Sequence, residues 1–165
     1  MIEQELETKL VAAIVALGVE GLDVRGLWNP VASGLVKGSE TDASVPAAAV
    51  VRVSPIAYDE VSFPSASFAC SVSLAVRTDM DPTGGLLATA AGSISGLLAR
   101  LHRTVAHGEY CGLDVTGLDV AAFHLTGGSG PDFDRTAATW AVNYSFTVFG
   151  VVTDADLQPN NQEDE

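Results

Sequence analysis

RTAATWAVNYSFTVFGV, residues 135–151, carries the most regular two-residue alternation in the chain. Successive side chains of a β-strand point to opposite faces of the sheet, so this alternation predicts one long strand that is buried on one side only. The larger side chains fall on one face, namely Trp140, Val142, Tyr144, Phe146 and Val148. The opposite face receives Thr139, Ala141, Asn143, Ser145 and Thr147.

A second stretch, SASFACSVSLAVRT at residues 65–78, repeats this pattern. Its apolar side chains are Phe68, Cys70, Val72, Leu74 and Val76. They alternate with Ser67, Ala69, Ser71, Ser73 and Ala75. We expect the two strands to lie in one sheet that has one apolar face.

The other face of these strands is predicted to carry small, uncharged side chains instead of the Lys, Glu, Gln or Arg usual at a solvated sheet. It is either an ordinary wet surface or a surface that another subunit covers, because the cores of protein interfaces are depleted of charge. Uncovered strand edges would also favour pairing with another chain. The candidate interface residues on this face are Ser71, Ser73, Asn143 and Ser145.

Two helices are predicted outside the strands. Apolar residues recur every three or four positions from Ile2 to Leu17, which predicts an amphipathic helix that ends at Gly18. Glu3, Glu5, Glu7 and Lys9 are expected away from its apolar stripe. Asp81 followed by Pro82 predicts the start of a second helix of about 24 residues, which would cover the apolar face of the sheet.

The predicted order is helix, strand, long loop, strand, strand, helix, strand, strand. Consecutive strands with short connections favour antiparallel pairing, so the predicted class is α+β, with a mostly antiparallel sheet and two helices packed on one face. Residues 1–152 are expected to form one domain, with a long loop or arm at 28–46 and a disordered acidic tail at 153–165.

The loop at 28–46 supplies two further candidate contact residues. Trp28 stands at its mouth and is either a core residue or an aromatic anchor for a partner. Lys37 lies near its middle, where the tip of an arm or hairpin is expected.

The charge balance is strongly acidic, with 21 acidic and 8 basic residues and a net charge of −13. Such a surface repels nucleic-acid phosphates and anionic membranes, so sequence-independent DNA binding is not expected. The acidic N-terminus differs from a secretion signal, and no apolar run reaches the length of a membrane-spanning helix. The protein is therefore expected in the cytoplasm of the cell that makes it.

No pattern in the sequence predicts catalysis, a metal or a cofactor. The glycines of residues 127–130 are expected to form a turn between two strands, because a phosphate-binding loop leads into a helix. His102 and His107 are five residues apart, which does not suit two metal ligands on one helix. Asp132 and Asp134 are interpreted as turn and strand-start residues. The chain is not predicted to be an enzyme.

Particular segments are similar to a known family. The acidic first helix, the strand pair VVRVSPIAYDE and SFACSVSLAVRTDMDP, the helix that begins with Asp-Pro and the last strand DRTAATWAVNYSFTVFG resemble the tail terminator, or tail completion, proteins of long-tailed bacteriophages. The resemblance covers residues 1 to about 150 and rests on element order and strand character. The acidic tail at 153–165 has no counterpart in the family.

The resemblance implies a structural virion protein at the head–tail junction. Such proteins form a hexameric ring of identical subunits that caps the tail tube protein and joins the head–tail connector protein. DNA would pass through the acidic lumen without specific binding, and the loop at 28–46 would correspond to the family's variable arm. The family has no catalytic residues to transfer.

Two alternatives stay open at this point. One is a head-completion or connector protein of similar fold. The other is a small protein-binding or ligand-binding module that uses the 28–46 loop for recognition and has a concave apolar pocket in the monomer.

Overall fold

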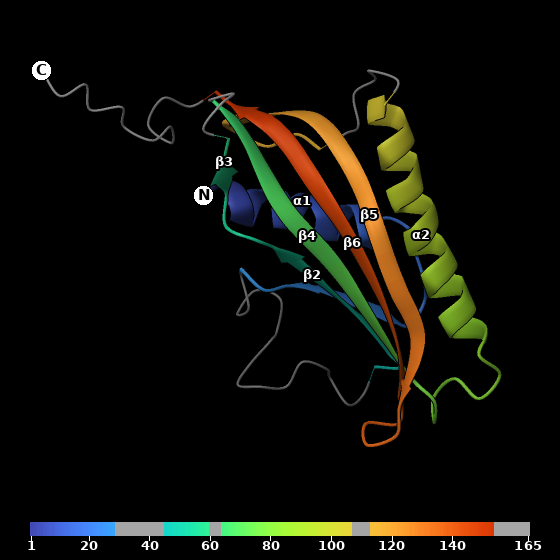
Figure 1. Cartoon of the computed structure of the whole chain (residues 1–165). Coiled ribbons are helices and arrows are strands. Elements are labelled where there is room, and N and C mark those ends of the chain that lie inside the picture. Colours follow the sequence, from blue (N-terminus) through green and yellow to red (C-terminus); the bar gives the residue numbers. More distant parts are fainter. Residues whose placement is uncertain (29–44, 60–63, 107–112, 154–165) are drawn as a thin grey trace, which may run out of the picture.

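The fold is a six-stranded sheet with two helices, seen in a computed structural model that describes residues 1–28, 45–59, 64–106 and 113–153 (Figure 1). In chain order the elements are α1 (Ile2–Val15), β1 (Leu22–Gly26), β2 (Ala47–Val53), β3 (Ala57–Tyr58), β4 (Ser65–Arg77), α2 (Gly85–Ala106), β5 (Leu118–Asp134) and β6 (Thr139–Val152). The predicted α+β class is confirmed, and the predicted order of elements broadly matches.

The sheet has the strand order β1-β2-β4-β6-β5, and the short β3 pairs with β4. β1 and β2 are parallel, whereas all the other pairings are antiparallel. The two stretches that alternate most regularly in the sequence are the neighbours β4 and β6. Their register runs from Ser65 opposite Val151 to Arg77 opposite Thr139.

Both helices lie on the apolar face of the sheet. α1 packs against β1 and β2, and α2 packs mainly along β5. Tyr144 belongs to the apolar face of β6, and its hydroxyl donates a 2.9 Å hydrogen bond to the Ala91 carbonyl of α2. Phe123 stacks on Phe146 with 4.8 Å between ring centroids. Fully buried core side chains include Leu6, Phe68, Leu74, Ile94 and Phe146.

Helix α2 starts a little later than the sequence predicts. It spans Gly85–Ala106, 22 residues, and the chain turns before it, with the Gly84 amide bonded to the Asp81 carbonyl. The Asp81 carboxylate still caps the helix, because it accepts hydrogen bonds from the amides of Leu86 and Leu87 at 3.1 and 3.0 Å. The side chain therefore reaches the helix across the turn.

The glycine-rich stretch at 127–130 is part of β5, although the sequence predicts a turn there. β5 continues to Asp134 through two irregularities, between Leu125 and Gly127 and between Ser129 and Asp132. Gly127 and Gly130, with positive φ angles of 150° and 102° that only glycine adopts readily, lie at these two register shifts. The turn of the hairpin instead occupies residues 135–138.

The acidic side chains of α1, which the sequence places away from its apolar stripe, are not all exposed. Glu3 and Glu7 are only 8% and 2% exposed. Glu7 Oε1 accepts a 2.8 Å hydrogen bond from the Trp28 amide, and Glu3 Oε1 accepts a 3.0 Å bond from the Ile56 amide. Glu5 Oε1 accepts from both the amide and the hydroxyl of Thr116.

These three carboxylates bind chain segments that have just left, or are about to enter, the sheet. Amides at such positions lie outside the strand ladder, and a partly buried amide such as that of Trp28 or Ile56 needs an acceptor. The glutamates of α1 supply it, so this helix joins the ends of β1 and β2 to the segment before β5. Glycine at position 26 leaves the space that the Glu7 carboxylate occupies.

Replacing Glu7 with Leu is expected to lower the free energy of unfolding by about 2 kcal/mol, because the Trp28 amide then loses its acceptor. Glu7→Gln keeps an acceptor oxygen at the same place and is expected to cost clearly less. Urea unfolding followed by circular dichroism measures both variants. Equal stability of Glu7→Leu and the wild-type chain would contradict this role for the carboxylate.

Candidate interaction surfaces

The sheet face opposite the helices, here called the outer face, contains four of the predicted interface residues. Ser71 is paired in register with Ser145, and Ser73 with Asn143. The Ser73 hydroxyl donates a 2.8 Å hydrogen bond to Asn143 Oδ1. Ser73 and Ser145 are exposed, while Ser71 and Asn143 are half-buried. The structure thus places these four side chains together at the centre of the outer face.

The outer face of β4 and β6 is uncharged over most of its length. Its positions from Ser65 to Ala75 and from Thr139 to Val151 carry only small, polar or apolar side chains. Charged side chains flank this region: Arg52 is exposed opposite Ser71 on β2, and Arg77 ends β4. On β5 the exposed Asp119, Asp132 and Asp134 lie opposite Val151, Ala141 and Thr139 of β6. An uncharged strip on a chain with a net charge of −13 is therefore a distinct surface feature.

One end of the outer face is apolar. Phe149 and Val151 of β6 are 42% and 37% exposed. They border a hollow of about 430 Å³ that Tyr58, Ser67 and Ala121 also line. The alternation in the sequence already puts Phe149 and Val151 on the same face as Ser145. The hollow beside them cannot be predicted from the sequence, because residues of β3 and β5 form part of its lining.

Trp28 is separate from the outer-face residues. Its indole Nε1 donates a 2.7 Å hydrogen bond to the Val53 carbonyl, and the half-buried side chain packs against the hydrophobic core. The structure therefore supports the core alternative for this residue. Lys37 and most of the predicted 28–46 loop lie outside the described residues, as does the predicted tail after Thr153.

A second hollow, here called the α2 groove, lies between the N-terminal half of α2 and the β5–β6 hairpin. Its volume is about 570 Å³, and it opens to solvent. Leu87 and Ala91 form its wall on the helix side, and Val142 and Tyr144 form its floor. No sequence pattern predicts it, because it depends on the separation between a helix and a distant hairpin.

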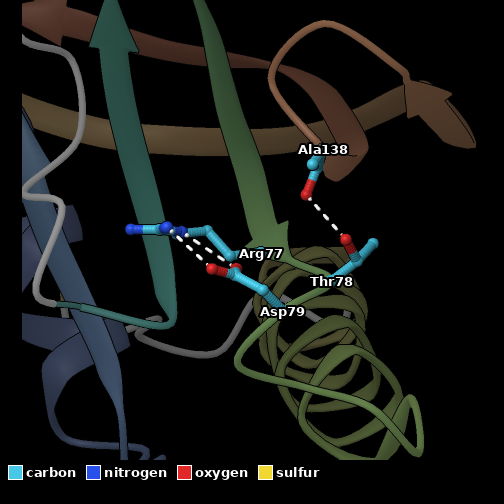
Figure 2. Close-up of polar contacts among 4 residues, drawn as sticks. All are labelled: Arg77, Thr78, Asp79 and Ala138. Atoms are coloured by element: carbon cyan, nitrogen blue, oxygen red, sulfur yellow. Dashed lines mark hydrogen bonds and ion pairs between the residues drawn. The ribbon is translucent and has the colours of Figure 1, made fainter.

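The hairpin turn is attached to the end of β4, as Figure 2 shows. The Ala138 carbonyl accepts 3.0 Å hydrogen bonds from both the amide and the hydroxyl of Thr78. Next to it, Arg77 pairs with Asp79 at 2.9 Å (Figure 2). Asp134 accepts bonds from the amides of Thr136 and Ala137 and so closes the turn.

Among the described residues, no group of three or more metal-ligating side chains comes together. His102 Nδ1 lies 3.0 Å from the Phe123 carbonyl oxygen and 3.4 Å from the Leu125 amide nitrogen, so this histidine covers the edge of β5. His124 is its neighbour, with ring centroids 5.6 Å apart. His107 and Cys111 lie outside the described residues.

Comparison with protein-family models and with curated proteins finds no match for this chain. Within the described part of the chain, neither helix has the length and apolarity needed to cross a membrane.

Cys70 is expected to be unreactive in the folded chain. Burial, and secondarily the nearby Glu7 carboxylate, raise the pKa of its thiol to about 12. At pH 8 only about one thiol in ten thousand would then be ionised, and the thiolate is the reactive form. In a Cys111→Ser variant, thiol titration with a disulfide reagent should remain slow at pH 8 and become fast in denaturant. Rapid labelling of the native chain would contradict the burial of Cys70.

Proposed function

We propose that this chain is a structural subunit of a long-tailed phage, and that copies of it form a ring that caps the tail tube and meets the head connector. The observation that carries the proposal is the uncharged outer face centred on Ser71, Ser73, Asn143 and Ser145. The resemblance of residues 1 to about 150 to tail terminator proteins is the reason for proposing this particular assembly, a ring on the tail tube.

The outer face has the chemistry of a surface that another protein covers. The centres of interfaces are poor in charge, and small side chains allow two backbones to approach closely. Phe149 and Val151 extend this face with exposed apolar area, which burial in a contact would stabilise. A net charge of −13 otherwise keeps copies apart, so self-association requires such an uncharged region.

The same acidity suits a ring around DNA. Carboxylates that line a lumen repel phosphates, so a duplex would pass through without adhering. A head-completion or connector protein would use the outer face in the same way. For the binding-module alternative, the favourable observation is the α2 groove, which is a concave apolar site of the kind that such a module needs.

Arginine at position 71 or 143 is expected to prevent ring formation or tube capping while the monomer stays folded. Each replacement puts a charge at the centre of the outer face, and an unpaired charge at a buried contact costs several kcal/mol. The matched control is Ala12→Arg, which adds the same side chain at an exposed position of α1.

Light scattering of the purified variants, together with negative-stain images of tubes incubated with them, measures this effect. Normal assembly by both Ser71→Arg and Asn143→Arg would remove the outer face from the proposal. Loss of assembly in Ala12→Arg as well would show that added charge, not its position, is responsible.

The absolute mass of the wild-type protein over a concentration series tests the ring itself. A closed ring of about six subunits is expected, because closed cyclic symmetry ends a head-to-tail series of contacts. A chain that stays monomeric and also fails to bind purified tail tubes would contradict the proposed function.

A further inference from the structure

Two histidines from different elements lie together at the edge of the sheet. His102 belongs to α2, and His124 belongs to β5, the last strand in the sheet order. Their ring centroids are 5.6 Å apart, and the ring planes are inclined by 50°. His102 is half-buried, whereas His124 is exposed. The pair therefore bridges a helix and an edge strand at a place that solvent reaches.

The hydrogen bond of His102 determines which of its ring nitrogens is available. Nδ1 lies 3.0 Å from the Phe123 carbonyl oxygen and 3.4 Å from the Leu125 amide nitrogen. The nearer group is an acceptor, so we place the hydrogen on Nδ1, because a nitrogen lone pair facing that oxygen would be repelled. Nε2 then carries the free lone pair. Histidines that bind metals are commonly fixed in this way, with the other ring nitrogen donating to a backbone carbonyl.

The separation of the two rings suits a shared metal ion. Zinc binds histidine nitrogen at about 2.0–2.1 Å with tetrahedral geometry, so two imidazoles on one ion have ring centres about 5 Å apart. The observed separation of 5.6 Å is slightly longer. A small rotation of the exposed His124 side chain is enough to close the difference.

The surroundings of the pair admit a cation. Within the described chain neither ring takes part in an ion pair. No third metal-ligating side chain joins the two rings among the described residues, so water would fill the remaining coordination positions, which the exposure of His124 permits. The net charge of −13 raises the local concentration of cations around the protein.

We propose that His102 and His124 together bind a divalent transition-metal ion, such as zinc, between α2 and β5, with water in the remaining coordination positions. Imidazole nitrogen is a favoured ligand of zinc, nickel and copper. Magnesium and calcium instead prefer oxygen ligands. The ligand set therefore selects the first group of ions over the second.

A bound ion would tie the C-terminal half of α2 to the sheet. His102 already contacts the backbone of β5, and the ion adds a second link through the His124 side chain. Both ligands are in place only in the folded chain, so binding would also stabilise the fold. The inference goes beyond the ring proposed above, because it uses neither Ser71 and Asn143 nor a second copy of the chain. It holds whether or not copies of the chain form a ring.

The test is zinc binding to the full chain without an affinity tag, after removal of bound metal with a chelator. All measurements use a Cys111→Ser background, because an accessible thiol is itself a zinc ligand and the other cysteine, Cys70, is buried. The ring signals of each histidine in nuclear magnetic resonance spectra report where zinc binds, and calorimetry gives the affinity. We expect one zinc ion per chain, shifts of the ring signals of His102 and His124, and no shift at His107.

The decisive variant is His124→Gln, because His124 is exposed and its replacement leaves the fold intact. It is expected to lower the zinc affinity by at least about tenfold. His107→Gln is the matched control and should keep the affinity. Zinc should raise the thermal midpoint of the wild-type histidine set and of His107→Gln, but not that of His124→Gln. His102→Gln would also remove the bond to the Phe123 carbonyl, so it does not separate the two roles of that residue.

Several results would overturn the proposal. They are unchanged ring signals of both histidines with zinc in excess, equal zinc affinity of His124→Gln and the parent chain, or binding through His107 alone. Equal shifts with magnesium would show an adventitious ion only, attracted by the acidic chain. Ring assembly is measured separately by the arginine variants of the outer face, so the two proposals stand or fall independently.

Discussion

The antiparallel pairing of β4 with β6 is the constraint on which the rest of the structure depends. It runs without interruption from the Ser65–Val151 pair to the Arg77–Thr139 pair. Side chains that are paired in register share a face, so Val72 and Tyr144 lie on the helix side and Ser71 and Ser145 lie on the other. A shift of one residue would exchange the two faces, and burial of the apolar one therefore sets the register.

The helices complete the sheet in two different ways. α1 contributes apolar side chains and also carboxylates, of which Glu3 and Glu7 are buried, and these accept hydrogen bonds from amides at the ends of β1 and β2 and before β5. Buried carboxylates are tolerated where such donors converge on them. α2 covers the edge of β5 through His102, but at its other end it stands away from the hairpin. The first helix closes its part of the apolar face, and the second leaves a groove.

The two candidate surfaces consequently have different chemistry. The outer face of β4 and β6 is uncharged and built mainly from small side chains, with exposed Phe149 and Val151 at one end. The α2 groove is concave and mainly apolar, and no charged side chain lines it. The two surfaces lie on opposite faces of the sheet.

The sequence by itself determined the two long strands and the face on which each of their residues lies. It also determined the apolar stripe of α1 and the α+β class. Alternation and helical spacing are local properties of the chain, so both can be read without the tertiary structure. Only the tertiary structure decided which polar groups are buried, how far β5 extends through Gly127–Gly130 and where the grooves lie. Glu7 and Trp28 illustrate the difference. Their hydrogen bond joins residues 21 positions apart, and periodicity within one element carries no information about the segment that packs across from it.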